Sequence, residues 1–597
     1  MNIAQPLDRA LSAGGALPPA APRRRMLGTL AALGVGAVAC GQGGQGEGGA
    51  GAGAGTGVAG QARPAQAGSP VRGGIARIGL NQEPQTLNPY LVSQGATTRV
   101  VLTTLEGLVA VNETSEYYPV LAKEVPTTQN GGVSADGRTV TYRLREGVKW
   151  SDGAAFTSAD VAFTWEAIMA RDNRVVSRAG YDLIEGVNTP DAATAVVRYK
   201  APYAAYLTRF PYVLPKHVLG ALPNMNEAPF NRQPVGTGPF VVSEWAAGDK
   251  IVMKRNASFR DAGKPYLEGL TFLIIPSREA GIARLRNAEI DVLWDLTESS
   301  TAQLKTEQTL RVAVTPSINV ERLVLNLAAP ADGADQNRPH PILSDQKVRR
   351  ALQHAIDTKT IIDKLYAGQA QPAGSPIHMG WAADPSLKPL AFDVNAAKRL
   401  LDEAGWAAGP AASGGVRSKG GARLTLTVNS TAGDKARELL EQVLQEQWKV
   451  IGVDLQIKNL DSTALLAPWA SNGPRARGNF DMLLYSTGPD IDPDAHVYGY
   501  FHSSQIPTAA NNGAGLNFSR YVNPKVDAAL AAAQASVDQA RRKASYAEAQ
   551  KLIAEDLPHL LLFARQSINA FRTAVQGDTP NPWQNFSWDT QNWWLKQ

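Results

Sequence analysis

The sequence predicts an α/β protein with more than one sheet. Its 597 residues are several times the ~100 to 200 residues of a single domain, so we expect two or three lobes with separate cores. Segments with the period of a strand and segments with the period of a helix both occur, and they do not alternate strictly. That mixture favours an α/β class built on more than one sheet.

The clearest strand precedes the clearest helix. Val140, Tyr142 and Leu144 alternate with polar residues, which is the period of a half-buried strand. Residues 157–160 then resemble a capping box, which predicts a helix start. Residues 344–345 indicate a second helix start of the same kind.

The composition is that of a globular protein whose body is almost neutral. Hydrophobic residues make up 44% of the chain and charged residues 19%. The formal net charge is +5, but the first 39 residues hold four arginines and one aspartate, so the remainder carries +2. A net charge this small gives no positive electrostatic field that would attract nucleic acid.

The N-terminal segment has the order of an export signal. Three arginines at 23–25 precede an apolar run over 26–39, which at 14 residues is shorter than the ~20 residues of a membrane-spanning helix. Residues 37–40 resemble a lipobox, so we expect Cys40 to be lipidated and to anchor the protein. The arginines also partly resemble a twin-arginine signal. An ordinary export signal or a buried free thiol is the alternative.

The segment 40–72 is expected to be a flexible tether. Its glycine-rich part has almost no side chains that could bury surface, so it cannot offset the entropy of folding. Residues 41–46 and 55–60 match the dinucleotide pattern GxGxxG, but neither follows a strand or opens a helix. Cys40 is the single cysteine, which excludes an intramolecular disulfide and a cysteine metal cluster.

From about residue 73 to 570, a series of motifs resembles one family in its order. The motifs are 82–89 (QEPQTLNP), 105–108 (LEGL), 119–122 (PVLA), 136–153 with 160–161, 236–240 (GTGPF), 288–292 (AEIDV), 348–357, 404–406 (AGW) and 523–527 (NPKVD). They resemble the oligopeptide, dipeptide and nickel-binding receptors of ABC importers, which are extracellular solute-binding proteins of family 5.

The resemblance implies a two-lobed periplasmic-binding-protein-like fold of the class II, or cluster C, type, with an extra inserted subdomain. The first lobe would comprise residues 73–112, 235–318 and 566–597, the insertion 113–234, and the second lobe 319–565. A solute would bind between the lobes and be enclosed by hinge closure. The implied function is an extracytoplasmic receptor, monomeric and without cofactor, metal or catalysis, that delivers oligopeptides or dipeptides to ABC permease subunits and their ATPases.

In peptide-binding members a second-lobe carboxylate pairs with the α-ammonium of the ligand. The resemblance places Asp490 in that role, with Asp492 as the next candidate; this chain has Pro489 where the family pattern has its aspartate. The alternative is that these acids only form turns, as clusters of Asp and Pro often do.

The remaining candidates are polar or aromatic residues that the resemblance brings to the cleft. Asn81 and Glu83 follow the first strand, while Trp294 and Asn326 end strands of the two lobes. Aromatic rings that could stack on a ligand are those of Tyr485, Trp381 and Trp150. Each of these residues could instead serve the core or the backbone.

Other functions have weaker support. His496 and His502 are six residues apart, which suits no common helix or strand face for a metal. Nucleophile elbows, zinc-protease helices and phosphate loops are not found in the sequence. The open alternatives are an oligosaccharide, an opine or a metal chelate as ligand, a sensory role for the same fold, and a secreted hydrolase.

Overall fold

A computed structural model describes residues 68–329, 338–410 and 414–596, all within the compact unit Arg63–Gln597. The predicted export signal, Cys40 and most of the tether lie outside the described residues. Among the described residues no helix is long and apolar enough to cross a membrane.

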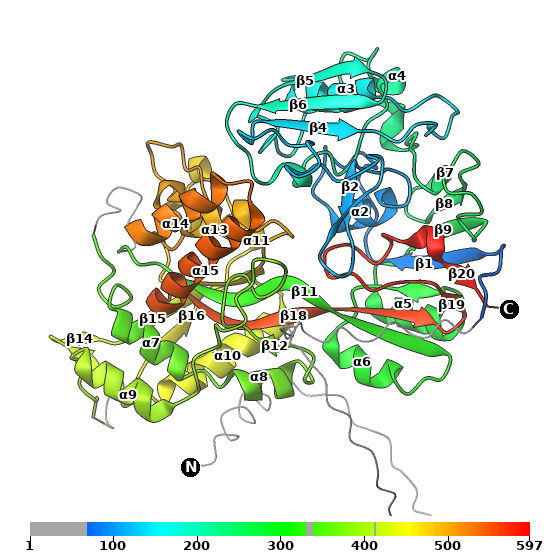
Figure 1. The fold of residues 1–597 in the computed structure, drawn as a ribbon. Helices are drawn as coiled ribbons and strands as arrows, with labels where there is room; N and C mark the ends of the chain where they lie inside the picture. The colour runs from blue at the N-terminus through cyan, green and yellow to red at the C-terminus, as the bar shows by residue number, and fades with distance from the viewer. Residues whose placement is uncertain (1–67, 330–337, 411–413, 597) are drawn as a thin grey trace, which may run out of the picture. The chain divides into compact units, whose positions relative to one another are not determined.

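A single mixed sheet runs through both lobes (Figure 1). Eleven strands of the described chain belong to it, ten of them in the order β16-β15-β17-β11-β18-β10-β1-β9-β8-β7, with β12 paired to β18. Its centre is the antiparallel pair β11 (Leu310–Leu325) and β18 (His559–Arg572). These long strands extend from one lobe into the other, so they connect the two lobes.

The first lobe holds one end of the sheet. Strand β1 pairs in parallel with β9 and β10, so its neighbours arrive by crossover connections that contain helices. Its elements are β1 (Ile75–Leu80), α2 (Gly95–Val101), β7 (Phe240–Ala246), β8 (Lys250–Arg255), β9 (Gly269–Ile274), α5 (Arg278–Arg286), β10 (Val292–Leu293) and α6 (Glu298–Leu304). Buried residues such as Ile78, Phe272 and Val292 form its core.

A smaller sheet and a second core lie within the range expected for the insertion. The three-stranded sheet has the order β4-β6-β5, and Val140, Tyr142 and Leu144 are buried in its core, as their alternation predicts. Asp160 accepts a hydrogen bond from the Thr157 backbone at 2.8 Å, which confirms the capping box. The elements here are β2 (Val109–Val111), β3 (Tyr117–Pro119), β4 (Thr139–Arg143), α3 (Ser158–Met169), β5 (Ile184–Asp191), β6 (Thr194–Tyr199) and α4 (Lys216–Leu219).

The second lobe holds the other end of the large sheet and most of the helices. The predicted helix start at 344–345 is confirmed, because the Asp345 side chain caps α7 by accepting from the Lys347 backbone. The strands are β12 (Gln371–Pro372), β13 (Ser418–Lys419), β14 (Ala422–Arg423), β15 (Thr425–Asn429), β16 (Asp454–Ile457) and β17 (Met482–Thr487). The helices are α7 (Gln346–His354), α8 (Thr358–Leu365), α9 (Val394–Glu403), α10 (Lys435–Lys449), α11 (Ser462–Leu465), α12 (Pro474–Arg477), α13 (Asp494–Phe501), α14 (Pro524–Gln534) and α15 (Gln539–Asp556).

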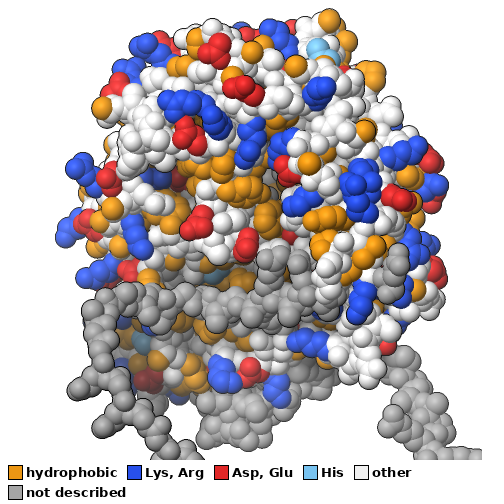
Figure 2. Space-filling model, turned by 45° about the vertical axis from the view of Figure 1, so that its right-hand side comes forward, with side chains coloured by type: hydrophobic (Ala, Val, Ile, Leu, Met, Phe, Trp, Pro, Cys, Tyr) orange, Lys and Arg blue, Asp and Glu red, His pale blue; other side chains and the backbone are white. Residues whose placement is uncertain are grey.

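After β18 the chain returns to the first lobe. Strands β19 (Val575–Gln576) and β20 (Trp594–Leu595) pair, and Trp593 packs in the core that contains Ile78. Between them Asn581 donates a hydrogen bond to the Val111 carbonyl at 3.0 Å, which fixes the loop 578–586. On the face drawn in Figure 2, basic and acidic side chains are interspersed, in keeping with the small net charge.

The predicted α/β class with more than one sheet is therefore confirmed. The exact lobe boundaries stay predictions, although the separate core built around Val140 lies inside the range 113–234. The structure adds that the sheet is continuous through β11 and β18, so the two lobes share one hydrogen-bonded ladder.

Candidate ligand-binding site

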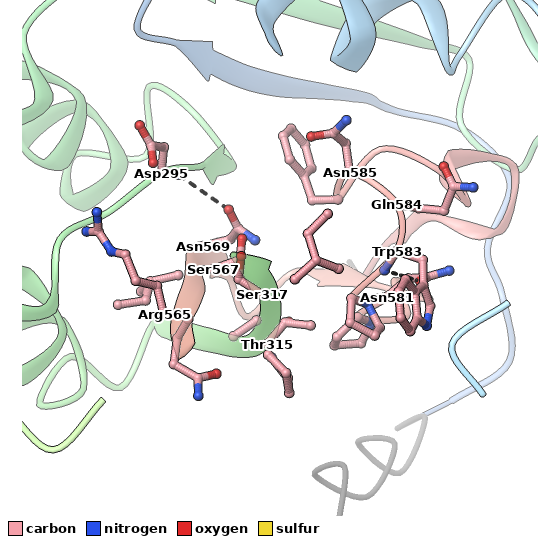
Figure 3. Close-up of a pocket in the computed structure, with 18 of the residues that line it drawn as sticks. Asp295, Thr315, Ser317, Arg565, Ser567, Asn569, Asn581, Trp583, Gln584 and Asn585 are labelled. Carbon is pink, nitrogen blue, oxygen red and sulfur yellow. Dashed lines mark hydrogen bonds between the residues drawn. The ribbon is translucent and has the colours of Figure 1, made fainter. Parts of the chain in front are cut away.

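A cavity of about 420 Å³ lies along β11 and β18. We call it the hinge pocket; its lining comes mainly from residues 313–319 of β11, 565–571 of β18 and the loop 578–586. Figure 3 shows side chains from the two strands facing those of the loop across the cavity. The pocket therefore joins segments that are more than 200 residues apart in the sequence.

The pairing of the two strands is interrupted at the pocket. Strand β11 pairs with β18 as far as Pro316 and again from Val320, so residues 317–319 stand opposite Arg565 alone. A bulge of this kind releases backbone groups from the ladder and redirects side chains. The hinge pocket lies at this interruption.

Most of the polar lining is uncharged. Hydroxyl and amide groups dominate it, among them those of Thr315, Ser317, Ser567, Asn569, Asn581 and Asn585. An amide side chain both donates and accepts hydrogen bonds, and so does a hydroxyl. The rings of Trp583 and Phe586 add an apolar area beside them. This surface suits a neutral polar framework such as peptide backbone or sugar hydroxyls.

The carboxylates of the described lining are already paired. Each has an arginine nitrogen near a carboxylate oxygen: Asp295 with Arg278 at 3.5 Å, Glu298 with Arg565 at 3.6 Å, and Asp578 with Arg311 at 2.5 Å. Burial raises the pKa of Asp578, and the positive charge of Arg311 opposes that rise. These acids are held within the wall by their partners.

Two of the predicted residues lie directly behind this wall. Asn81 donates a hydrogen bond to the Asp295 carboxylate at 3.3 Å. Trp294 is buried, and the guanidinium carbon of Arg99 lies 3.3 Å from its ring centroid. Asp295 and Arg99 line the hinge pocket, so Asn81 and Trp294 contact lining residues without lining it themselves.

Glu83 holds the loop after β1 against the β7–β8 hairpin. Its carboxylate accepts hydrogen bonds from the Trp245 indole at 2.8 Å and from the Gly248 backbone at 3.0 Å. Both oxygens are thus engaged with the protein, and Glu83 is not among the lining of the hinge pocket. This geometry supports the structural alternative for Glu83.

The two predicted aspartates after β17 have different surroundings. Asp492 is buried and forms a bidentate ion pair with Arg542, each nitrogen–oxygen distance being 2.7 Å. Asp490 is exposed, and its carboxylate makes no hydrogen bond with any residue in the described ranges. Neighbouring residues partly shield this carboxylate from water, and this desolvation raises the pKa of Asp490. The positive charge of Arg209, in the smaller-sheet region, opposes that rise. Of the two, Asp490 is the carboxylate with free acceptor capacity.

The other predicted residues lie in cores. Asn326 is buried and donates to the carbonyls of residues 478 and 480, both at 2.9 Å. Trp150 is buried, and its indole donates to Asp160 at 3.4 Å. Tyr485 and Trp381 are half-buried against the second-lobe core. None of these residues is in the described lining of the hinge pocket, and neither are Asp490 and Asp492.

Sequence reasoning missed the loop 578–586, the interrupted part of β11 and Arg99. A signal for the loop was available, because residues 579–585 combine prolines, amides and a tryptophan after the last long strand. Arg99 offered no such signal, because the residues around it match no motif that marks a binding site.

Two lobes share the long strands β11 and β18, and a polar pocket lies where the pairing of these strands is interrupted. This arrangement is that of a solute-binding protein. A profile described as "Bacterial extracellular solute-binding proteins, family 5 Middle" matches residues 116–508. The chain belongs to this family, as the resemblance of its motifs indicates.

Known relatives agree over most of the chain. Protein XP55 of Streptomyces lividans is 31% identical over 483 residues, which are 80% of this chain and 81% of that protein. The oligopeptide-binding protein AppA of Bacillus subtilis is 27% identical, covering 89% of this chain and 93% of the relative.

Solved structures share the fold. The structure of NikZ from Campylobacter jejuni in complex with Ni(L-His) has a TM-score of 0.70 and 26% identity, covering 87% of this chain and 99% of that chain. The structure of Bacillus subtilis AppA in complex with a nonapeptide has a TM-score of 0.68 and 25% identity, covering 89% and 100%. These likenesses bear out the two-lobed fold of the family.

Proposed function

We propose that this protein is a receptor of an ABC importer that binds peptides between its lobes and delivers them to permease subunits. The observation that carries the proposal is the lining of the hinge pocket, where uncharged hydroxyl and amide groups face the cavity. Peptide backbone presents one donor and one acceptor per residue, which such groups can match. A relative named as oligopeptide-binding and a solved structure with a nonapeptide support this ligand class.

We further propose Asp490 as the anchor of the ligand's α-ammonium group. Its exposed carboxylate has no hydrogen-bond partner in the described chain, so a cation can pair with it without breaking a bond. Asp492 is the weaker candidate, because Arg542 already occupies its carboxylate. Removing Asp490 is expected to lower peptide affinity, whereas removing the exposed acid Asp363 of α8 is not.

Native mass spectrometry of the full chain with a mixed peptide library and an oligosaccharide panel tests this function. We expect retained peptides, and a weaker retention for Asp490→Ala than for the control Asp363→Ala. Retention of sugars alone would contradict the peptide proposal. Equal retention of peptides by both variants would contradict the role of Asp490 only.

An oligosaccharide is the second candidate ligand. The rings of Trp583 and Phe586 beside neutral hydrogen-bonding groups favour it, because sugars pack a ring face on aromatic side chains. The same panel separates the two candidates. In either case we propose a binding role without catalysis, as in the family, and a monomer.

We also propose that the mature protein is tethered outside the cytoplasm by a lipid on Cys40. The basic residues at 23–25, the apolar run and the single cysteine support this modification. Metabolic labelling with an alkyne fatty acid should mark the wild type and not Cys40→Ala. Labelling of both would contradict it.

A further inference from the structure

Arg99 is placed at the hinge pocket by a short helix and a tryptophan. Helix α2 carries it, and its guanidinium carbon lies 3.3 Å from the centroid of the Trp294 ring. A guanidinium on an indole face is attracted by the negative charge density of the ring. The stack holds the planar group in one orientation at the wall of the cavity.

The Arg99 side chain makes no hydrogen bond and no ion pair with any residue that the structure describes. Its Nε is buried and has no partner, and the same holds for Nε1 of Trp294. The negative charge of Asp295 acts on it, but that carboxylate already accepts from Asn81 and pairs with Arg278. By contrast, Arg565, which lines the same cavity, has Glu298 as its partner.

A cation whose neighbouring acid is engaged elsewhere is unfavourable in a partly dehydrated site. Burial lowers the pKa of Arg99 to about 10, so the group is still charged at neutral pH. An anion that enters the pocket would offset this cost. The planar guanidinium matches a carboxylate especially well, since two N–H groups can donate to its two oxygens.

The charges of the lining restrict which anion fits. Each of the three acids in the described lining pairs with an arginine, two of them with Arg278 and Arg311 from outside the lining, so Arg99 is the lining cation whose charge stays unpaired. One unpaired positive charge is matched by a single carboxylate on a neutral or zwitterionic solute, whereas a phosphate with two charges would bring a charge that finds no partner there. We propose that Arg99, stacked on Trp294, binds a carboxylate of the solute, which for a peptide is its C-terminal carboxylate.

This inference rests on the proposed peptide-binding function and on the hinge pocket as its site. The test is competition native mass spectrometry of the full chain with tri- to pentapeptides made in two forms, one with a free C-terminus and one with a C-terminal amide. A charge-assisted hydrogen-bonded pair predicts a preference of roughly 10- to 100-fold for the free acid. Arg99→Gln should remove that preference, while Arg99→Lys should keep part of it.

The matched control is Arg232→Gln, which removes an arginine stacked on another indole, that of Trp245, at 4.0 Å from the ring centroid and outside the described lining of the pocket. It should leave the acid-to-amide ratio unchanged, and a thermal unfolding curve shows whether each variant is folded. Equal binding of acid and amide by the wild type would overturn the role of Arg99 while leaving peptide binding intact. Retention of no peptide in either form would instead overturn the proposed function.

Discussion

The ion pair between Asp492 and Arg542 is expected to stabilise the second lobe and not to bind solute. Both side chains are buried, with 7% and 6% exposed, and two hydrogen bonds of 2.7 Å join them. Arg542 also donates to the Tyr546 hydroxyl at 3.0 Å. Burial lowers the pKa of Arg542, but its hydrogen bond to Asp492 and the negative charge of Asp492 outweigh that effect, so the pKa is raised. Removing one charge leaves the other buried and uncompensated.

Asp492→Asn should therefore lower the opening free energy of this region by about 3 to 5 kcal/mol. Native-state hydrogen exchange of α13 and α15 measures that energy locally, which suits a protein of several lobes better than one global transition. The control is Asp363→Asn, since Asp363 forms an exposed pair with Lys359 and such pairs contribute little.

The reasoning also predicts that folded Asp492→Asn protein keeps its peptide affinity. A change in opening free energy below about 1 kcal/mol, together with a tenfold loss of affinity, would refute the structural role. It would then make Asp492 the ammonium anchor in place of Asp490. The double replacement Asp492→Leu with Arg542→Met should recover part of the lost stability, because no unpaired charge is left.

Three further predictions concern other parts of the structure. Burial raises the pKa of Asp589 to about 8, above its unfolded value near 4, so between these pH values the folded state holds a proton that the unfolded state has lost. The free energy of unfolding should therefore fall as pH rises from about 4 to 8. Asp589→Asn should flatten this pH dependence when stability is measured by urea titration. A Cβ at Gly488 would lie 1.7 Å from the Ile318 carbonyl oxygen, so Gly488→Ala should cost on the order of 3 kcal/mol in denaturant melts, whereas Gly186→Ala, which meets nothing within 4 Å, should be nearly neutral. The Trp583 indole donates to the Ser115 hydroxyl at 2.8 Å, so Trp583→Phe and Ser115→Ala should each weaken peptide binding by roughly two- to tenfold in calorimetry, and unequal losses would show that the ring acts without this bond.

Local patterns in the sequence predicted the elements that depend on local contacts. The alternation around Val140 and the capping residues Thr157 and Asp345 concern neighbours within a few positions, and each is found in the structure. The family motifs predicted the two-lobed class for a different reason, since they mark turns and helix ends that recur in the family.

The site was predictable only in part. Asn81 and Trp294 were chosen from strand ends, and they lie one contact away from the cavity, behind Asp295 and Arg99. The lining itself depends on pairings such as that of Asn581 with Val111, which are 470 positions apart and leave no local pattern. Trp150 was misleading as an aromatic candidate, because a fully buried indole and a ligand-stacking indole have the same sequence signal.

The interruption of β11 gives the hinge pocket a second significance. Residues 317–319 stand opposite Arg565 alone, so the hydrogen-bonded ladder that the two lobes share is interrupted within the pocket. A strand pair bends most easily where its hydrogen bonds are missing. The groups that line the pocket therefore lie at the place where bending would occur. A solute that binds these groups more tightly in one bent state than in another would shift the equilibrium between the two states by that difference in binding free energy. Solute binding and lobe closure would then depend on the same few residues, so no other residues would be needed to couple the pocket to the hinge.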